Sequence, residues 1–372
     1  MNFALATLWH DRQRYIPGVL AVAFSAVLIA LQFGLLLGLL SVTSIPIDHT
    51  RADAWVGAAD VLSVDIGGPI PTAWVGRVAE YPEVAACEEY CQGFMKWKKA
   101  NGGEELCIVI GSRLDADALG AVDALTPELR ERLTEPDTVV IDEGELDRLG
   151  LAHGVGETGE ITGRKVRIVG LIRGYKSLAG PYVFCSVSTA RPLLRLQPYQ
   201  TTYLLAKCHS PPEAPAVVER LKRYEDMSAF TAPEFSRRSQ VHWLTKTKAG
   251  IALGYSALLG LLVGAVVTSQ TLYAATAGAL REYAVLRALG IPRWRMATAV
   301  MTQSFWVGIL GVLLAGPAVY GLARIAEVAG ARVLLSDWLL GSVAAITLAM
   351  ALISGLAALR SLRLIEPANL LR

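Results

Sequence analysis

The stretch Ile16–Leu40, IPGVLAVAFSAVLIALQFGLLLGLL, decides the fold of this chain because its 25 residues include no charged side chain. A helix of about 20 apolar residues is long enough to cross the hydrocarbon core of a bilayer. The stretch exceeds the roughly 7–15 residues of a signal-peptide core, and no small-x-small cleavage site directly follows it. It therefore predicts an uncleaved first membrane span.

Three further runs without charge follow in the last third of the chain. Lys248 and Arg281 bracket 32 uncharged residues, and Ala297–Ala323 and Trp338–Leu359 are also free of charge. The whole chain agrees in composition, with 53% hydrophobic residues, 18% charged residues and a mean hydropathy of +0.41. These runs predict four membrane-spanning helices, at 16–41, 248–280, 297–323 and 338–359.

The distribution of basic residues predicts the orientation of the spans. Arginines concentrate in the interfacial segment 1–15, the loop 281–296 and the tail 360–372. The short loop 324–337 has two arginines that are balanced by two acidic residues. Because positively charged loops stay in the cytoplasm, both termini and the loop 281–296 are expected there. Two lysines beside the start of the second span depart from this rule.

The segment 42–247, between the first two spans, has the composition of a soluble domain and is expected on the outer face. Its alternating apolar runs and turn residues predict a mixed α/β domain. The expected strands cover 61–65, 105–111, 138–142, 166–171, 182–187 and 202–207, and the expected helices cover 73–81, 143–149 and 213–224. The predicted fold class is an α-helical membrane protein with four transmembrane helices and a mixed α/β extracytoplasmic domain between helices 1 and 2.

The loop 281–296 contains the sequence REYAVLRALGIPRWR, from Arg281 to Arg295. Two leucines are spaced for one helix face, several arginines supply charge, and a glycine followed by a proline ends the helix. This pattern predicts a short amphipathic helix, which is either a docking element for a cytoplasmic partner or a positively charged anchoring loop. The candidate coupling residues are Arg281, Glu282, Leu286, Arg287, Leu289, Gly290 and Arg293.

Pairs of glycines four residues apart predict close helix packing in the first two spans. Such packing serves contacts inside one protomer or across a dimer. The pairs are Gly34 with Gly38, Gly250 with Gly254, and Gly260 with Gly264.

All five cysteines lie in the outer segment, where an oxidising environment favours disulfides. Cys87 and Cys91 are the closest pair, and we expect them either to form a disulfide or to be small buried apolar residues. The five histidines show no metal-ligand spacing with the cysteines, so no metal site is expected.

Motifs of catalysis are missing from the sequence. It contains no Gly-Lys dipeptide and hence no P-loop, no GxSxG elbow and no HExxH helix. No Asp, Glu, Lys, Arg or His lies inside the four uncharged runs, which argues against a proton relay. We therefore expect a chain that is not catalytic by itself and that binds no cofactor.

The order of one span, a large outer domain and three spans resembles that of FtsX/MacB-type ABC permeases. The segment Arg281–Gly290 closely resembles the signature that follows the second span in that family, and Arg363–Arg372 is similar to its C-terminal ending. The stretches Leu5–Gly34 and Glu234–Thr247 resemble the DevC-like branch. The resemblance covers the whole layout, whereas the matching motifs occupy about a fifth of the chain.

This resemblance implies a permease subunit without a fused ATPase in the inner membrane of a bacterium. Its implied partners are a separate cytoplasmic ABC ATPase that holds ATP and Mg, a second permease copy in a homodimer or heterodimer, a periplasmic membrane-fusion adaptor and the lipid bilayer, but no nucleic acid. The implied function is export by mechanotransmission. The alternative is an FtsX-like signalling unit that controls an outer partner such as a cell-wall hydrolase.

Mechanotransmission would need a rigid connection between the two faces of the membrane. A continuous second helix over residues 241–279 is expected to supply it, with a length of roughly 55–60 Å at 1.5 Å per residue.

The arginine distribution predicts the side of the membrane on which each segment lies. A reporter fused after Ser210 should be extracytoplasmic and one fused to the C-terminus cytoplasmic, because the arginine-rich segments place both termini and the loop 281–296 in the cytoplasm. Protease accessibility in spheroplasts checks this. If both reporters lie on the same side, the number of spans is wrong.

Overall fold

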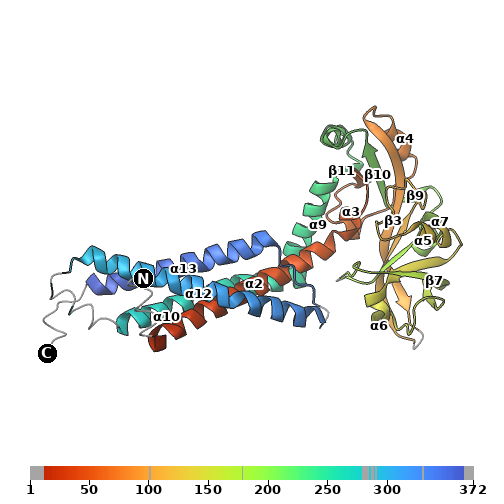
Figure 1. Cartoon of the computed structure of the whole chain (residues 1–372). Coiled ribbons are helices and arrows are strands. Elements are labelled where there is room, and N and C mark those ends of the chain that lie inside the picture. The colour runs from red at the N-terminus through yellow and green to blue at the C-terminus, as the bar shows by residue number, and fades with distance from the viewer. Residues whose placement is uncertain are drawn as a thin grey trace. The chain divides into compact units, whose positions relative to one another are not determined.

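The computed structural model describes residues 12–99, 102–177, 179–278, 285, 289, 291–328 and 331–363 (Figure 1). It describes no side chains at 272, 276, 293 and 358–363. The chain divides into two compact units. The outer unit is Leu40–Thr247, and the membrane unit combines the residues up to Leu39 with those from Lys248 onward.

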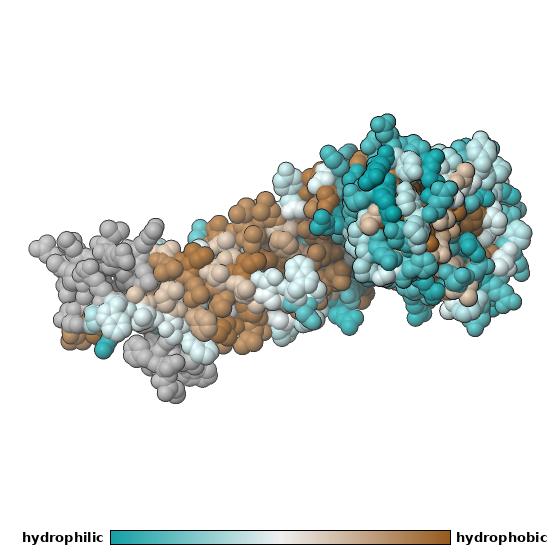
Figure 2. Space-filling model, turned by 90° about the horizontal axis from the view of Figure 1, so that it is seen from above, coloured by the Kyte–Doolittle hydropathy of each residue, from teal (hydrophilic) through white to brown (hydrophobic). Residues whose placement is uncertain are grey.

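In the described residues, the membrane unit contains four helices that are long and apolar enough to cross a bilayer. They are α2 (Arg12–Thr43), α10 (Lys248–Gly278), α12 (Arg293–Val328) and α13 (Asp337–Arg363). Figure 2 shows that brown, apolar side chains cover these helices, whereas teal, hydrophilic side chains cover most of the outer unit. Such an apolar surface is typical of helices that face lipid. The predicted fold class is confirmed.

Small residues bring α2 and α10 close together in the membrane unit. A Cβ atom on Gly264 would lie 3.2 Å from the Cβ of Ser25, and one on Gly260 would lie 3.0 Å from a methyl group of Leu28. The Ser25 hydroxyl lies 3.0 Å from both the Gly264 carbonyl oxygen and Thr268 Oγ1. The pair Gly260 and Gly264 therefore packs against a helix of the same chain.

The pair on α2 packs differently, against the connection between α12 and α13. A Cβ atom on Gly38 would lie 1.9 Å from the Arg332 carbonyl oxygen, and one on Gly34 would lie 2.8 Å from a methyl group of Val333. The Leu334 amide donates a hydrogen bond to the Gly34 carbonyl at 3.0 Å. The missing side chains thus let this connection lie against α2.

Of the third predicted glycine pair, on α10, Gly250 is buried and Gly254 is half-buried.

Among its described residues, the outer unit is built on a nine-stranded sheet in the order β11-β1-β10-β3-β4-β8-β5-β7-β6, in which β6 also pairs with β3. The strands are β1 (Ala54–Ala58), β3 (Val84–Lys98), β4 (Glu104–Ser112), β5 (Thr138–Asp142), β6 (Thr158–Ile161), β7 (Arg164–Ile172), β8 (Tyr182–Ser186), β10 (Tyr203–Cys208) and β11 (Met227–Thr231). Two short strands, β2 (Ile70–Pro71) and β9 (Gln200–Thr201), pair with each other.

The long strand β3 joins the two halves of this sheet. Its first half pairs with β10, where Tyr90 lies opposite Tyr203. Its second half pairs with β4, and its last residues also pair with β6, so that this half of the sheet closes on itself. The first half is covered by α4 (Trp74–Ala79) and α8 (Ala214–Leu221), whereas α7 (Val187–Leu193) packs on β3 and β4. The remaining short helices are α3 (Ile45–Asp48), α5 (Pro127–Arg132) and α6 (Leu146–Leu149).

Five of the six predicted strands lie in β4, β5, β7, β8 and β10. The predicted strand 61–65 is wrong, because Val64–Ile66 forms the single 3-10 turn η1. The reason is the hydrogen-bond partner: the Val64 amide donates to the side-chain oxygen of Ser239 at 3.0 Å rather than to a neighbouring strand.

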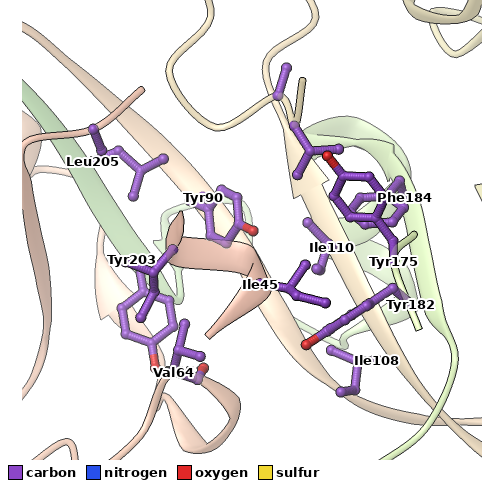
Figure 3. Close-up of a cluster of buried hydrophobic side chains, with 14 of the residues drawn as sticks. Ile45, Val64, Tyr90, Ile108, Ile110, Tyr175, Tyr182, Phe184, Tyr203 and Leu205 are labelled. Atoms are coloured by element: carbon purple, nitrogen blue, oxygen red, sulfur yellow. Dashed lines mark hydrogen bonds between the residues drawn. The ribbon is translucent and has the colours of Figure 1, made fainter. Parts of the chain in front are cut away.

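An aromatic core fills the outer unit where its two halves meet (Figure 3). The Trp55 ring lies 5.2 Å from Tyr90, 5.6 Å from Tyr203 and 5.7 Å from Phe235, measured between ring centroids. Figure 3 shows Ile45 of α3 between Tyr90 and Tyr203 on one side and residues of β4 and β8 on the other. The first residues of the outer unit therefore belong to its core.

Gly38 provides a test of packing in the membrane unit. Gly38→Ala should lower the free energy of unfolding by about 1–3 kcal/mol, because the new methyl group would overlap a backbone oxygen. Gly321→Ala on α12 is the matched control, since no atom lies within 4 Å of its added methyl group. Thermal unfolding in detergent measures both, and equal midpoints for the two variants would contradict the packing.

Candidate coupling site

The loop 281–296 is described only in part. Arg281, Glu282, Leu286, Arg287 and Gly290 lie outside the described residues, and Arg293 is described by its backbone alone. The Leu289 amide donates to the Val285 carbonyl at 3.0 Å, which is the hydrogen bond of one helical turn. The backbone of Arg293 begins α12.

Three apolar side chains of this loop and of the start of α12 are exposed. The exposed fractions are 50% for Val285, 75% for Leu289 and 63% for Trp294. The guanidinium of Arg295 lies 5.4 Å from the centre of the Trp294 ring. Apolar side chains that a unit leaves uncovered beside positive charge are suited to contact a partner protein or lipid headgroups.

At the other end of α10, the chain continues into the outer unit through α9 (Ala232–Lys246). This helix begins after Thr231, whose side-chain oxygen accepts a hydrogen bond from the Glu234 amide at 3.4 Å. It ends at Lys246, and Thr247 has an extended backbone with φ −97° and ψ 145°.

The expected continuous helix over 241–279 is therefore wrong, because α9 and α10 are separate helices on either side of Thr247. The Thr247 hydroxyl donates to the Trp243 carbonyl at 2.6 Å. In an unbroken helix the Thr247 amide would use this acceptor, so the side chain replaces the backbone bond.

Among the hydrogen bonds that tie α9 to the rest of the outer unit, four reach residues 61–65 or Ser44. Three of them reach residues 61–65, in and just before η1, and the fourth reaches Ser44 at the start of the unit. The donors and acceptors are Trp243 Nε1 to Asp65 Oδ2 at 2.9 Å, the Val64 amide to Ser239 Oγ at 3.0 Å, Arg238 Nε to the Val61 carbonyl at 2.9 Å, and Gln240 Nε2 to Ser44 Oγ at 3.0 Å. The helix and the outer domain are thus joined as one body.

Asp65 is a buried carboxylate at the centre of this junction. Its side chain accepts hydrogen bonds from Trp243 Nε1 and, at 3.2 Å, from Gln92 Nε2 of β3. Burial raises the pKa of Asp65 to about 6, and the bond from Trp243 opposes part of that rise. No local sequence pattern indicates this residue, because its partner on α9 is 178 positions away in the sequence.

Cys87 and Cys91 are both free thiols, and the predicted disulfide between them is wrong. The two residues lie on the single strand β3, four positions and about 13 Å apart. A disulfide needs Cα atoms within about 7 Å of each other. Cys91 is buried in the core, so the alternative of a small buried residue fits Cys91, whereas Cys87 is half-buried and burial raises the pKa of its thiol to about 12.

Within the described part of the chain, no three His, Cys, Asp or Glu side chains are grouped as metal ligands.

Residues 255–367, which cover most of α10 and all of the described residues of α12 and α13, match the family model described as FtsX-like permease C-terminal. None of the curated proteins matches the chain.

The chain is also similar to three solved structures. The periplasmic region of MacB from Actinobacillus actinomycetemcomitans has 12% identity and a TM-score of 0.35, with 51% of this chain and 94% of that structure covered. The extracellular domain of the noncanonic ABC-type transporter YknZ from Gram-positive bacteria has 8% identity and a TM-score of 0.33, with 47% and 100% covered. A domain of a putative permease protein from Porphyromonas gingivalis has 14% identity and a TM-score of 0.31, with 55% and 97% covered.

The four apolar helices and the inserted α/β domain define a multi-pass membrane protein with one large domain outside the helices. Its C-terminal part, residues 255–367, is similar to the C-terminal part of FtsX-like permeases.

The cysteine geometry predicts that the folded protein contains five thiols. After denaturation without reductant, alkylation should add five adducts to each chain, because all five cysteines are free thiols in the structure. Intact mass measures the number of adducts, and a sample that is reduced before alkylation is the control. A smaller number without reduction than with it would show that a disulfide exists.

Proposed function

We propose that this chain is the permease subunit of an ABC-type exporter, in which a separate cytoplasmic ATPase moves the outer domain through α10 and α9. The observation that carries the proposal is the exposed apolar turn of Val285 and Leu289 inside the segment that matches the FtsX-like permease family. In this proposal the chain itself is not catalytic, and ATP and Mg are held by the partner subunit.

The first step of the proposed mechanism is docking of the loop 281–296 in a groove of the ATPase. Leu289 is largely exposed, and burial of a whole leucine side chain is worth about 1.5–3 kcal/mol. Leu286, on the same helix face, would enter the groove together with Leu289. The arginines around these two leucines would pair with acidic residues at the rim of the groove. The position of the loop in the cytoplasm, with both termini, is part of the proposal.

The second step is transmission of movement to the outer domain. An ATPase that shifts the loop would displace α10, which begins at Lys248, and α10 would displace α9 across the extended Thr247. Because Trp243 and Ser239 of α9 are hydrogen-bonded to η1, the outer domain would follow α9 rather than slide along it.

The described contacts inside the membrane unit support handling of substrate outside the bundle. Several polar side chains of the spans bond to one another across helices. The pairs are Ser25 with Thr268, Tyr15 with Gln303, and Ser269 with Ser354. Amides and hydroxyls in this arrangement stabilise helix packing. We propose a lipid, glycolipid, peptide or small toxic compound as cargo that is moved by the outer domain.

The proposed assembly contains two permease copies in a bacterial inner membrane and a periplasmic adaptor, as in the DevC-like branch that the sequence resembles. The second copy, whether identical or related, would supply the other half of the moving outer assembly.

Docking of the loop is tested by Leu289→Glu and Leu286→Glu. Each should reduce the ATPase subunit retained on affinity-purified permease by more than about tenfold, because an unpaired carboxylate in an apolar groove costs several kcal/mol. Arg287→Glu should weaken retention less, since a charge at the rim is partly solvated. The complex's rate of ATP hydrolysis is measured in the same samples.

Val155→Glu is the matched control, because Val155 is an apolar residue of the outer unit with 51% of its surface exposed. It should leave retention and hydrolysis unchanged. Wild-type retention and activity in both leucine variants would mean that the loop is only a positively charged anchor.

A further inference from the structure

The junction between η1 and α9 contains a buried carboxylate that has no neighbouring cation among the described residues. Asp65 is 6% exposed, and within the described residues its side chain bonds to the N–H donors of Trp243 and Gln92. Burial in such a place costs an ionised carboxylate more free energy than a neutral, protonated carboxyl group.

Unused polar atoms lie beside this carboxylate. Gln92 is 2% exposed and donates through Nε2, whereas its Oε1 has no partner in the described part of the chain. The hydroxyl of Tyr90, which is fully buried on β3, also has no partner there. If the Gln92 amide turned over, Oε1 would take the place of Nε2 and accept a hydrogen bond from a protonated Asp65. The ionised carboxylate offers no such donor.

The other titratable groups around Asp65 have their own environments. Tyr90, Tyr182 and Tyr203 face it from β3, β8 and β10, and burial raises the pKa of each of these phenols, so all three stay neutral. On β3, burial also raises the pKa of Glu88, whose carboxylate accepts a hydrogen bond from the Gly120 amide.

On α9, the two ionisable residues to consider beside Asp65 are Arg238 and His242. The Arg238 guanidinium donates to the Val61 carbonyl and lies over the Phe230 ring. Burial lowers the pKa of His242, and the positive charges of Lys246 and Arg238 lower it further. Neither residue forms an ion pair with Asp65 in the described structure.

We propose that Asp65 is a proton-binding site that latches α9 to the outer domain: the protonated carboxyl holds the junction closed, and its ionisation loosens the junction. The proton comes from the solvent on the outer side and returns to it when the junction opens. The ligand is the proton itself, and no covalent change is involved.

The sign of the effect follows from linkage. Burial raises the pKa of Asp65 from 3.8 to about 6, so the closed junction binds the proton more tightly than the open one. The stabilisation by the proton is fully present below pH 3.8 and is lost as the pH rises through about 6. Between about pH 5 and about pH 8 the ratio of closed to open junction should fall by about tenfold.

Hydrogen exchange of the full-length protein in nanodiscs measures the latch. The Val64 amide is the reporter, because it donates to Ser239 of α9 across the junction. After correction for the intrinsic exchange rate, its protection should fall by about tenfold from about pH 5 to about pH 8. Protection of β5 and β8 amides in the second half of the sheet should stay constant and serves as the internal control.

Asp65→Asn tests the assignment, because asparagine keeps the shape and hydrogen bonding of a neutral carboxyl group. Its junction should show the same protection at both pH values and exceed the wild type at the higher one. Trp243→Phe should lower protection at both values and keep the pH dependence. His242→Gln, the matched control for the other titratable group, should behave as the wild type.

Constant protection in the wild type would overturn the proposal. So would a pH dependence that persists in Asp65→Asn or disappears in His242→Gln. If Asp65→Asn does not fold, the wild type and His242→Gln still decide the matter. The latch is independent of the proposed function, because these measurements need no ATPase and no cargo.

Discussion

The constraint on which this structure depends is that backbone polar groups in a bilayer must find partners within their own segment. Four apolar helices satisfy it, and residues with charge and irregular backbone are left to the connections. The loop from α12 to α13 remains close to α2 only because Gly34 and Gly38 leave room for its backbone. The first connection is long enough to fold as a separate domain, which is the 208-residue unit Leu40–Thr247.

Within that domain, the strand β3 and the helix α9 connect the parts. β3 carries both halves of the sheet, and α9 brings Phe235 into the aromatic core while its last turns bond to η1. A movement applied to α9 therefore acts on a core that is packed around Trp55 and Tyr203. The single extended residue Thr247 separates α9 from α10 along the chain.

Local sequence patterns predicted the strands that read as short apolar or alternating runs. β4, β5, β7, β8 and β10 are such strands. β3 was not predicted, because Glu88 and Glu89 interrupt its apolar pattern: Glu88 is buried against the Gly120 amide, and Glu89 pairs with Arg191. The disulfide between Cys87 and Cys91 is predicted from their closeness in the sequence. Because both residues lie on one extended strand, their Cα atoms are too far apart in space to be bridged.

The sequence by itself determined the four spans, the place of the inserted domain and its mixed α/β class, because length and uninterrupted apolar character are local properties that the bilayer constrains directly. It also located the candidate coupling loop by its charge and helix-ending residues. Only the tertiary structure decided that the helix breaks at Thr247 and that Asp65 meets Trp243 across 178 positions. Such contacts depend on how separate elements pack, and no periodicity along the chain encodes the burial of one carboxylate.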